Sequence, residues 1–109
     1  MHALVSVWTM AEGRLREQQR GLHEQIVPVV SKLPGFVAGY WNRDPVTGKA
    51  HGLIVFETEA DARRLKEFIQ GDTKRSAEAG LTYDSLAIVE VLASAPTAVT
   101  ARAHQSDRK

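Results

Sequence analysis

The sequence predicts an α+β fold in which two helices cover one face of a four-stranded antiparallel sheet. Segments rich in β-branched and aromatic residues alternate with two capped segments whose apolar residues recur every three or four positions. The predicted order is strand, helix, strand, strand, helix, strand, and a split βαβ sandwich is the simplest fold with that order. The 109 residues, 43% of them hydrophobic and 25% charged, suffice for one such domain but not for two.

The first strand and the first helix are predicted from residues 3–33. Residues 3–8, ALVSVW, contain no residue that disfavours a strand. The pattern Thr9–Glu12 fits a capping box, and the apolar stripe after it predicts a long amphipathic helix near residues 10–33. Pro28 has no N–H to donate, so we expect it to bend this helix or shorten its last turn.

The remaining elements are predicted as strands at 36–43, 51–57 and 83–92 and a helix near 59–70. Residues 44–48 contain Pro and Gly and join two strands over so short a distance that only an antiparallel hairpin is possible. The pattern Thr58–Asp61 caps the second helix. Residues 72–80 are polar and are expected to hold at most one loose turn.

The end of the chain differs in composition from the rest. Residues 94–109 have few large apolar side chains and no sustained period. We therefore expect a domain at residues 1–93 and a flexible tail at 94–109 that folding does not require, because such a composition cannot offset the entropy lost on ordering.

Charge and composition exclude several classes of function. A net charge of +1 provides no basic surplus for binding nucleic acid or an anionic membrane. The absence of cysteine excludes disulfides, thiolate nucleophiles and cysteine-ligated metals. No apolar stretch approaches the roughly 20 residues of a membrane span, and no basic region precedes the apolar start, so neither a span nor a signal peptide is predicted. We expect a cytoplasmic protein.

Three predicted strands are apolar on both faces. Residues 53–56 and 86–89 are continuously apolar, and residues 36–38 are similar, whereas a sheet with one face in water should alternate apolar and polar residues. Two helices can cover only one face. We therefore expect a homodimer in which a second copy covers the helix-free face. The alternative is that a small protein simply exposes a few apolar residues.

Short segments along the chain resemble a known superfamily. They are Ile26–Val30, Leu33–Phe36, Gly39–Trp41, Asp44–Gly48, Val55–Ala60 and Val89–Val91. Across about residues 3–93 the chain resembles the dimeric α+β barrel superfamily, in particular its antibiotic-biosynthesis-monooxygenase-like branch. The resemblance implies ferredoxin-like βαββαβ subunits whose sheets pair face to face. It also implies activities such as cofactor-independent oxygenation of polyketide quinols, or haem degradation.

The hairpin register determines which side chains share a face. If the loop is 44–48, Arg43 opposes Lys49 and Trp41 opposes His51, so that Trp41, Arg43 and His51 lie on one face. The alternative is a packed pair without function, and a slip of one residue would place Trp41 and His51 on opposite faces.

On that register we expect a site for a planar aromatic substrate. Trp41 and Tyr83 would form the walls that bind the ring, Arg43 would stabilise a developing anion, and His51 would transfer the proton. The sequence contains no metal-ligand spacing, no glycine-rich phosphate loop and no thiol. We therefore expect a reaction without metal or cofactor, such as the oxygenation of a quinol that supplies its own electrons.

Other classes of function remain open. Residues 49–56 resemble the third-strand octamer of RNA-recognition domains, but His51 and Leu53 stand where the stacking aromatics should be. A haem-degrading member should have an Asn in the first strand and Trp and His in the second helix, whereas this chain offers only Ser6 in the strand. A non-catalytic small-ligand binder or a structural homodimer explains the sequence as well as an enzyme does.

Overall fold

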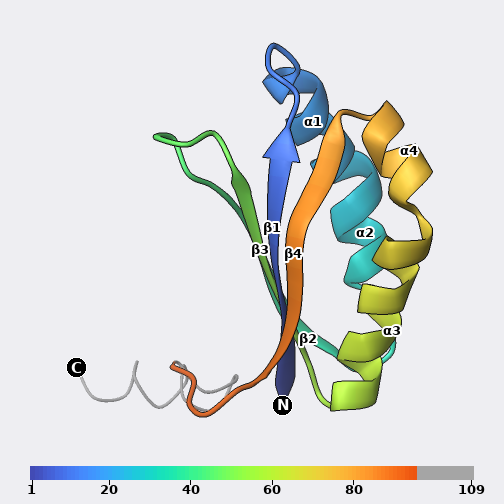
Figure 1. The fold of residues 1–109 in the computed structure, drawn as a ribbon. Coiled ribbons are helices and arrows are strands. Elements are labelled where there is room, and N and C mark those ends of the chain that lie inside the picture. The colour runs from blue at the N-terminus through green and yellow to red at the C-terminus, as the bar shows by residue number, and fades with distance from the viewer. Residues whose placement is uncertain (96–109) are drawn as a thin grey trace.

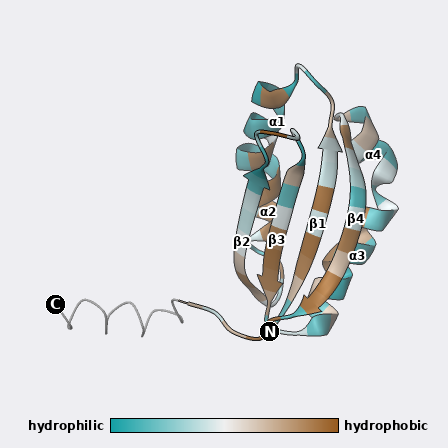
Figure 2. Ribbon diagram, turned by 60° about the vertical axis from the view of Figure 1, so that its left-hand side comes forward, coloured by the Kyte–Doolittle hydropathy of each residue, from teal (hydrophilic) through white to brown (hydrophobic). Residues whose placement is uncertain are grey.

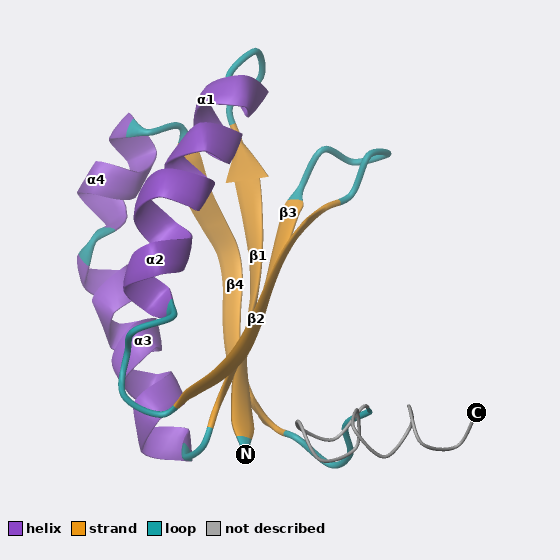
Figure 3. Cartoon of the chain, turned by 180° about the vertical axis from the view of Figure 1, so that it is seen from behind, coloured by secondary structure: helices purple, strands orange, loops and turns teal. Residues whose placement is uncertain are grey.

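The computed structural model describes residues 1–95, in which every helical segment lies on one side of a four-stranded sheet (Figures 1 and 3). The elements are β1 (His2–Met10), α1 (Leu15–Gly21), the π-helical η1 (Leu22–Ile26), α2 (Val27–Val30), β2 (Phe36–Arg43), β3 (Ala50–Phe56), α3 (Glu59–Gly71), α4 (Thr73–Glu78) and β4 (Leu81–Glu90). The strand order is β2-β3-β1-β4 with all pairs antiparallel, which confirms the predicted fold class. The tail predicted at 94–109 lies outside the described residues from position 96 onward.

The first helix begins later than the sequence predicts. Strand β1 continues to Met10, and Gly13 at φ +79° forms a turn before α1 begins at Leu15. The predicted capping box is wrong, because the Thr9 hydroxyl donates to the Asp84 carboxylate at 2.9 Å instead of accepting from a helix N–H. The Ala11 N–H donates to the Gly80 carbonyl at 2.8 Å, so the residue after β1 is held by the residue that precedes β4.

Next to Pro28, where a bend or a shortened turn was expected, the helix contains a π-helical segment. In η1 the Val27 N–H donates to the Leu22 carbonyl, five residues back, and Pro28 follows directly in the first turn of α2. Pro28 has no N–H to donate to the carbonyl four residues back. The change from α-helical to π-helical hydrogen bonding therefore lies next to the residue that interrupts the α-helical pattern.

The predicted hairpin register is wrong by one residue. The Asp44 N–H donates to the Lys49 carbonyl at 2.8 Å, so the loop contains the four residues 45–48 and not five. The Asp44 carboxylate accepts from the Val46 N–H at 2.8 Å, and Gly48 adopts φ +77°, which together fix this shorter turn. As a result Arg43 pairs with Ala50 instead of with Lys49.

The helix-facing side of the sheet follows from this register, since cross-strand partners share a face. Its four rows are Arg43-Ala50-Trp8-Tyr83, Trp41-Gly52-Ser6-Leu86, Gly39-Ile54-Leu4-Ile88 and Phe36-Phe56-His2-Glu90. The buried core lies over the last two rows, where Leu4, Ile54 and Phe56 pack against Val30 of α2 and Leu65 of α3. The aromatic residues of the first two rows are only partly buried.

No helix of the described chain covers the opposite, open face of the sheet (Figure 3). Its apolar rows are Ala38-Val55-Ala3-Val89 and Tyr40-Leu53-Val5-Ala87. Figure 2 shows hydrophobic ribbon along β3, β1 and β4 toward the end of the sheet near the N-terminus. Tyr40 is 60% exposed, Val89 40% and Leu53 37%. The expectation of strands that are apolar on both faces is therefore confirmed.

The cap predicted for the second helix is confirmed. The Thr58 hydroxyl oxygen accepts from the Asp61 N–H at 3.2 Å, as an N-cap should. The Asp61 carboxylate in turn accepts from the Thr58 hydroxyl at 2.8 Å and from Arg64. The helix ends at Gly71, and residues 73–78, predicted to hold at most one loose turn, form the short helix α4.

Candidate functional site

The register places the predicted catalytic residues on different faces. His51 pairs with Asn42 on the open face, whereas Trp41 pairs with Gly52 on the helix-facing side, together with Arg43. His51 and Arg43 therefore do not form one site within a single subunit. The expectation that Trp41, Arg43 and His51 share a face is wrong, because side chains alternate between faces and one residue of slip exchanges them.

Trp41 packs toward the hydrophobic core. It contacts the buried cluster from β2, and its indole ring lies over Gly39, where a Cβ would come within 2.7 Å of the ring. Trp41 and Tyr83 were both predicted as substrate walls, but they lie on the two edge strands, β2 and β4. Three strand spacings, about 14 Å, separate these strands, so the two rings do not flank one small ligand in the way expected.

The aromatic partner of Tyr83 is Trp8. Their ring centroids are 5.9 Å apart with an interplanar angle of 77°, an edge-to-face contact between β1 and β4. A register shift between Val7 and Trp8 brings these two residues opposite each other. Tyr83 therefore has an aromatic partner on the helix-facing side of the sheet, and this partner is Trp8 and not Trp41.

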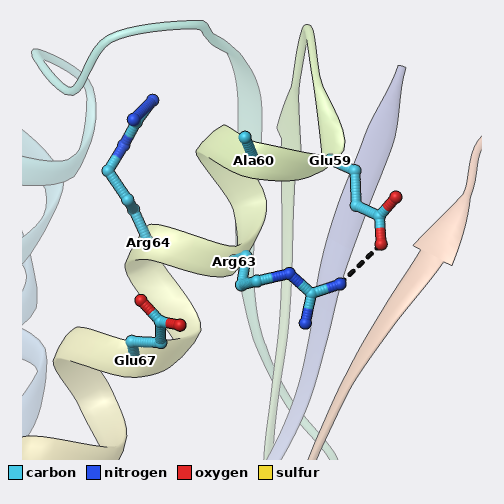
Figure 4. Close-up of a pocket in the computed structure, with 5 residues that line it drawn as sticks. All are labelled: Glu59, Ala60, Arg63, Arg64 and Glu67. Carbon is cyan, nitrogen blue, oxygen red and sulfur yellow. Dashed lines mark hydrogen bonds and ion pairs between the residues drawn. The ribbon is translucent and has the colours of Figure 1, made fainter.

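One hollow on the surface lies entirely on α3. It has a volume of about 370 Å³ and is lined by Glu59, Ala60, Arg63, Arg64 and Glu67 (Figure 4). Arg63 donates to Glu59 at 2.5 Å, and Arg64 pairs with Asp61, so both guanidinium groups already have partners in the same helix. A surface formed by one helix with internally paired charges offers little to a ligand.

A second hollow is formed by two elements and contains a predicted site residue. It has a volume of about 530 Å³ and lies, open to solvent, between α4 and the first residues of β4. We call it the α4–β4 groove, and its lining residues are Thr73, Lys74, Ser76, Ala77, Leu81, Thr82 and Tyr83. Tyr83 thus contacts Trp8 and also lines this groove.

Sequence reasoning identified Tyr83 but missed the α4 side of the groove. Residues 72–80 appeared only as a polar connection, and their hydroxyl groups and Lys74 carried no motif. The available signal was weak: the run Thr73–Glu78 has no helix breaker and precedes by two residues the strand that contains Tyr83. Nothing in that pattern shows which strand the short helix will lie beside.

Two further observations bear on the class of function. Within residues 1–95, no group of three or more His, Asp or Glu side chains is placed to hold a metal ion. None of the helices in this part of the chain is both long and apolar enough to cross a membrane.

A polar network crosses the open face at the hairpin end of the sheet. Lys49 Nζ lies 2.6 Å from Asp84 Oδ2 and 3.1 Å from Thr9 Oγ1, which connects the residue before β3 with β1 and β4. The hydrogen bond from Lys49, and then the one from Thr9, lower the pKa of Asp84 below its usual value. The network marks the end of the apolar part of this face.

We expect this network to make stability fall in acid. Because the pKa of Asp84 is lower in the folded state than in the unfolded chain, its contribution is complete above about pH 4 and is lost as the pH falls through the folded value. Thermal unfolding measured from pH 6 to pH 2 should show a shallower decline for D84N than for the parent. K49M should also reduce the slope, whereas an unchanged slope in both variants would contradict the role of the network.

Comparison with known proteins gives a structural match. The chain is similar in structure to a "putative monooxygenase" from Shewanella loihica PV-4, with a TM-score of 0.60 and 14% sequence identity. The match covers 85% of this chain and 95% of that protein. No family model matches the sequence, and no curated protein matches it. The match supports the fold, shared over nearly the whole of the described domain.

Proposed function

We propose that the chain binds a planar aromatic ligand in the α4–β4 groove and acts as a cofactor-independent monooxygenase of a quinol-type substrate. The observation that carries the proposal is the position of Tyr83, which lines a groove of about 530 Å³ and packs edge to face on Trp8. The structural similarity to a protein named as a putative monooxygenase supports the same class of reaction. In this proposal Tyr83 binds the ring, and Trp8, which packs on Tyr83 without lining the groove, holds it in place. Trp41, predicted as the second wall, has no part in the site.

The reaction requires no electron donor besides the substrate. In an anthrone, the ring methylene loses a proton to a solvent base and gives an enolate, and this electron-rich carbon reacts with O₂. One oxygen atom forms a new carbonyl at that carbon and the other leaves as water, so the methylene gives up two hydrogens and four electrons. The proton returns from solvent in the water that leaves. The protein needs to bind the ring, exclude water and favour the anion.

The groove supplies groups suited to binding the ring. Tyr83 presents an aromatic ring held by Trp8, and Leu81 and Ala77 add apolar surface. The hydroxyl groups of Thr73 and Ser76 on α4 provide hydrogen-bond donors and acceptors around the ligand. Such a mixture of apolar surface and a few polar groups is typical of small-molecule sites.

The test is turnover of anthrone by the purified protein in air, measured as anthraquinone formation. An aromatic contact is worth about 0.5–1.5 kcal/mol, so we expect Y83L to reduce kcat/KM by up to about tenfold. F68L is the matched control, because Phe68 is an exposed aromatic residue of α3 that does not line the groove. Equal rates for Y83L and the parent would contradict the site. Anthrone binding without turnover would contradict the reaction and favour a non-catalytic ligand-binding protein.

We further propose that the open face forms a homodimer interface. Eight apolar residues in two adjacent rows cover four strands on this face, and no helix of the described chain shields them. A two-fold arrangement would bury the same surface of both copies. The Lys49–Thr9–Asp84 network would then lie at the rim, where polar groups are usual in interfaces.

A further inference from the structure

The residues that line the α4–β4 groove carry a positive charge and no negative charge. Of its seven lining residues, Lys74 is the cation, three carry aliphatic hydroxyl groups, and none is a carboxylate. A ligand in the groove therefore meets a positive charge and several hydrogen-bond donors, with no acid among the lining residues to repel an anion.

Lys74 also differs from its neighbours on α4. Arg75 is paired with Asp72 at 3.7 Å, within the same turn of the chain. In contrast, Lys74 makes no ion pair in the part of the chain that the structure describes, and its side chain is exposed at the groove. An unpaired cation beside a hollow can bind an incoming anion without first breaking an internal contact.

We infer that the ligand of the α4–β4 groove is an aromatic anion, with an ionised oxygen substituent such as a carboxylate or phenolate bound by Lys74. This inference rests on the proposed function, because it names the substrate class of the same site. The ring stacks against Tyr83, and the anionic oxygen lies toward α4, where Thr73 and Ser76 donate further hydrogen bonds. Lys74 thereby takes the anion-stabilising role that the sequence predicted for Arg43.

The test compares two probes with the same ring and different charge. Binding of 1-naphthoate and of neutral 1-naphthalenemethanol is measured by calorimetry for the parent and for K74M, which keeps an apolar stem of similar length. We expect K74M to weaken 1-naphthoate about three- to tenfold and to leave 1-naphthalenemethanol unchanged, since only the anion loses a charged partner. K32M is the matched control, because Lys32 lies outside the groove.

The outcomes separate this inference from the proposed function. If K74M weakens the binding of both probes equally, or does not weaken the binding of 1-naphthoate, the recognition of an anion is overturned. The groove itself is still tested in that case, by the binding of the neutral probe to Y83L. Failure of both probes to bind the parent overturns the inference and the aromatic site together. A loss of 1-naphthoate affinity in K32M equal to that in K74M would overturn the specific role of Lys74.

Discussion

Replacing Gly35 with alanine should destabilise the domain more than the same change at another left-handed glycine. Gly35 adopts φ +78°, where a residue with a Cβ costs about 1–2 kcal/mol. A Cβ there would also overlap the Asp61 carboxylate, which accepts from Thr58 and Arg64 at the start of α3. The Gly35 carbonyl accepts from the Glu57 N–H at 2.8 Å, so the backbone cannot move freely to relieve the overlap.

G48A provides the matched control for this prediction. Gly48 has φ +77°, but a Cβ at this position would have no atom within 4 Å to meet. G48A should therefore show only the cost of a left-handed backbone conformation, without a steric overlap. We expect G48A to lower Tm by about 5–10 °C and G35A to lower it by at least about twice as much. Equal shifts in thermal unfolding would show that the Asp61 carboxylate moves aside without cost.

A charged side chain at Leu53 should dissociate the proposed dimer. Leu53 lies in the middle of the open face, between Tyr40 and Val5. In a face-to-face dimer a glutamate there would lose water without gaining a partner, which is unfavourable by several kcal/mol. We expect the dimer of the parent, with twice the 12.0 kDa chain mass, to become a monomer in L53E at micromolar concentration.

Sedimentation of the parent, L53E and V46E distinguishes an interface effect from an effect of charge alone. Val46 is 91% exposed in the hairpin loop and lies outside the two apolar rows, so V46E should remain dimeric. Circular dichroism checks that L53E stays folded, as expected for a side chain already 37% exposed in the single subunit. A parent of monomer mass would contradict the proposed interface directly.

Local patterns in the sequence were sufficient for the fold class. Strand β2 occupies the predicted residues 36–43, and Thr58 caps α3 as predicted, because strand propensity and capping depend on neighbours a few positions away. The apolar character of both strand faces was also visible in the sequence and predicted the apolar rows of the open face. The start of the first helix was not, because Thr9 bonds to Asp84, 75 residues away, and not to the nearby backbone.

The candidate site was decided by tertiary structure. One hydrogen bond, from the Asp44 N–H to the Lys49 carbonyl, makes the hairpin loop one residue shorter than predicted. Trp41 and His51 therefore lie on opposite faces of the sheet, because side chains alternate between faces along a strand. The pairing of β1 with β4 places Trp8 against Tyr83, and the position of α4 places Lys74 beside that strand. The sequence by itself determined where the four strands and α3 lie. Contacts between distant segments determined which side chains meet, because the pairing of β1 with β4 and the packing of α4 depend on residues far apart in the chain.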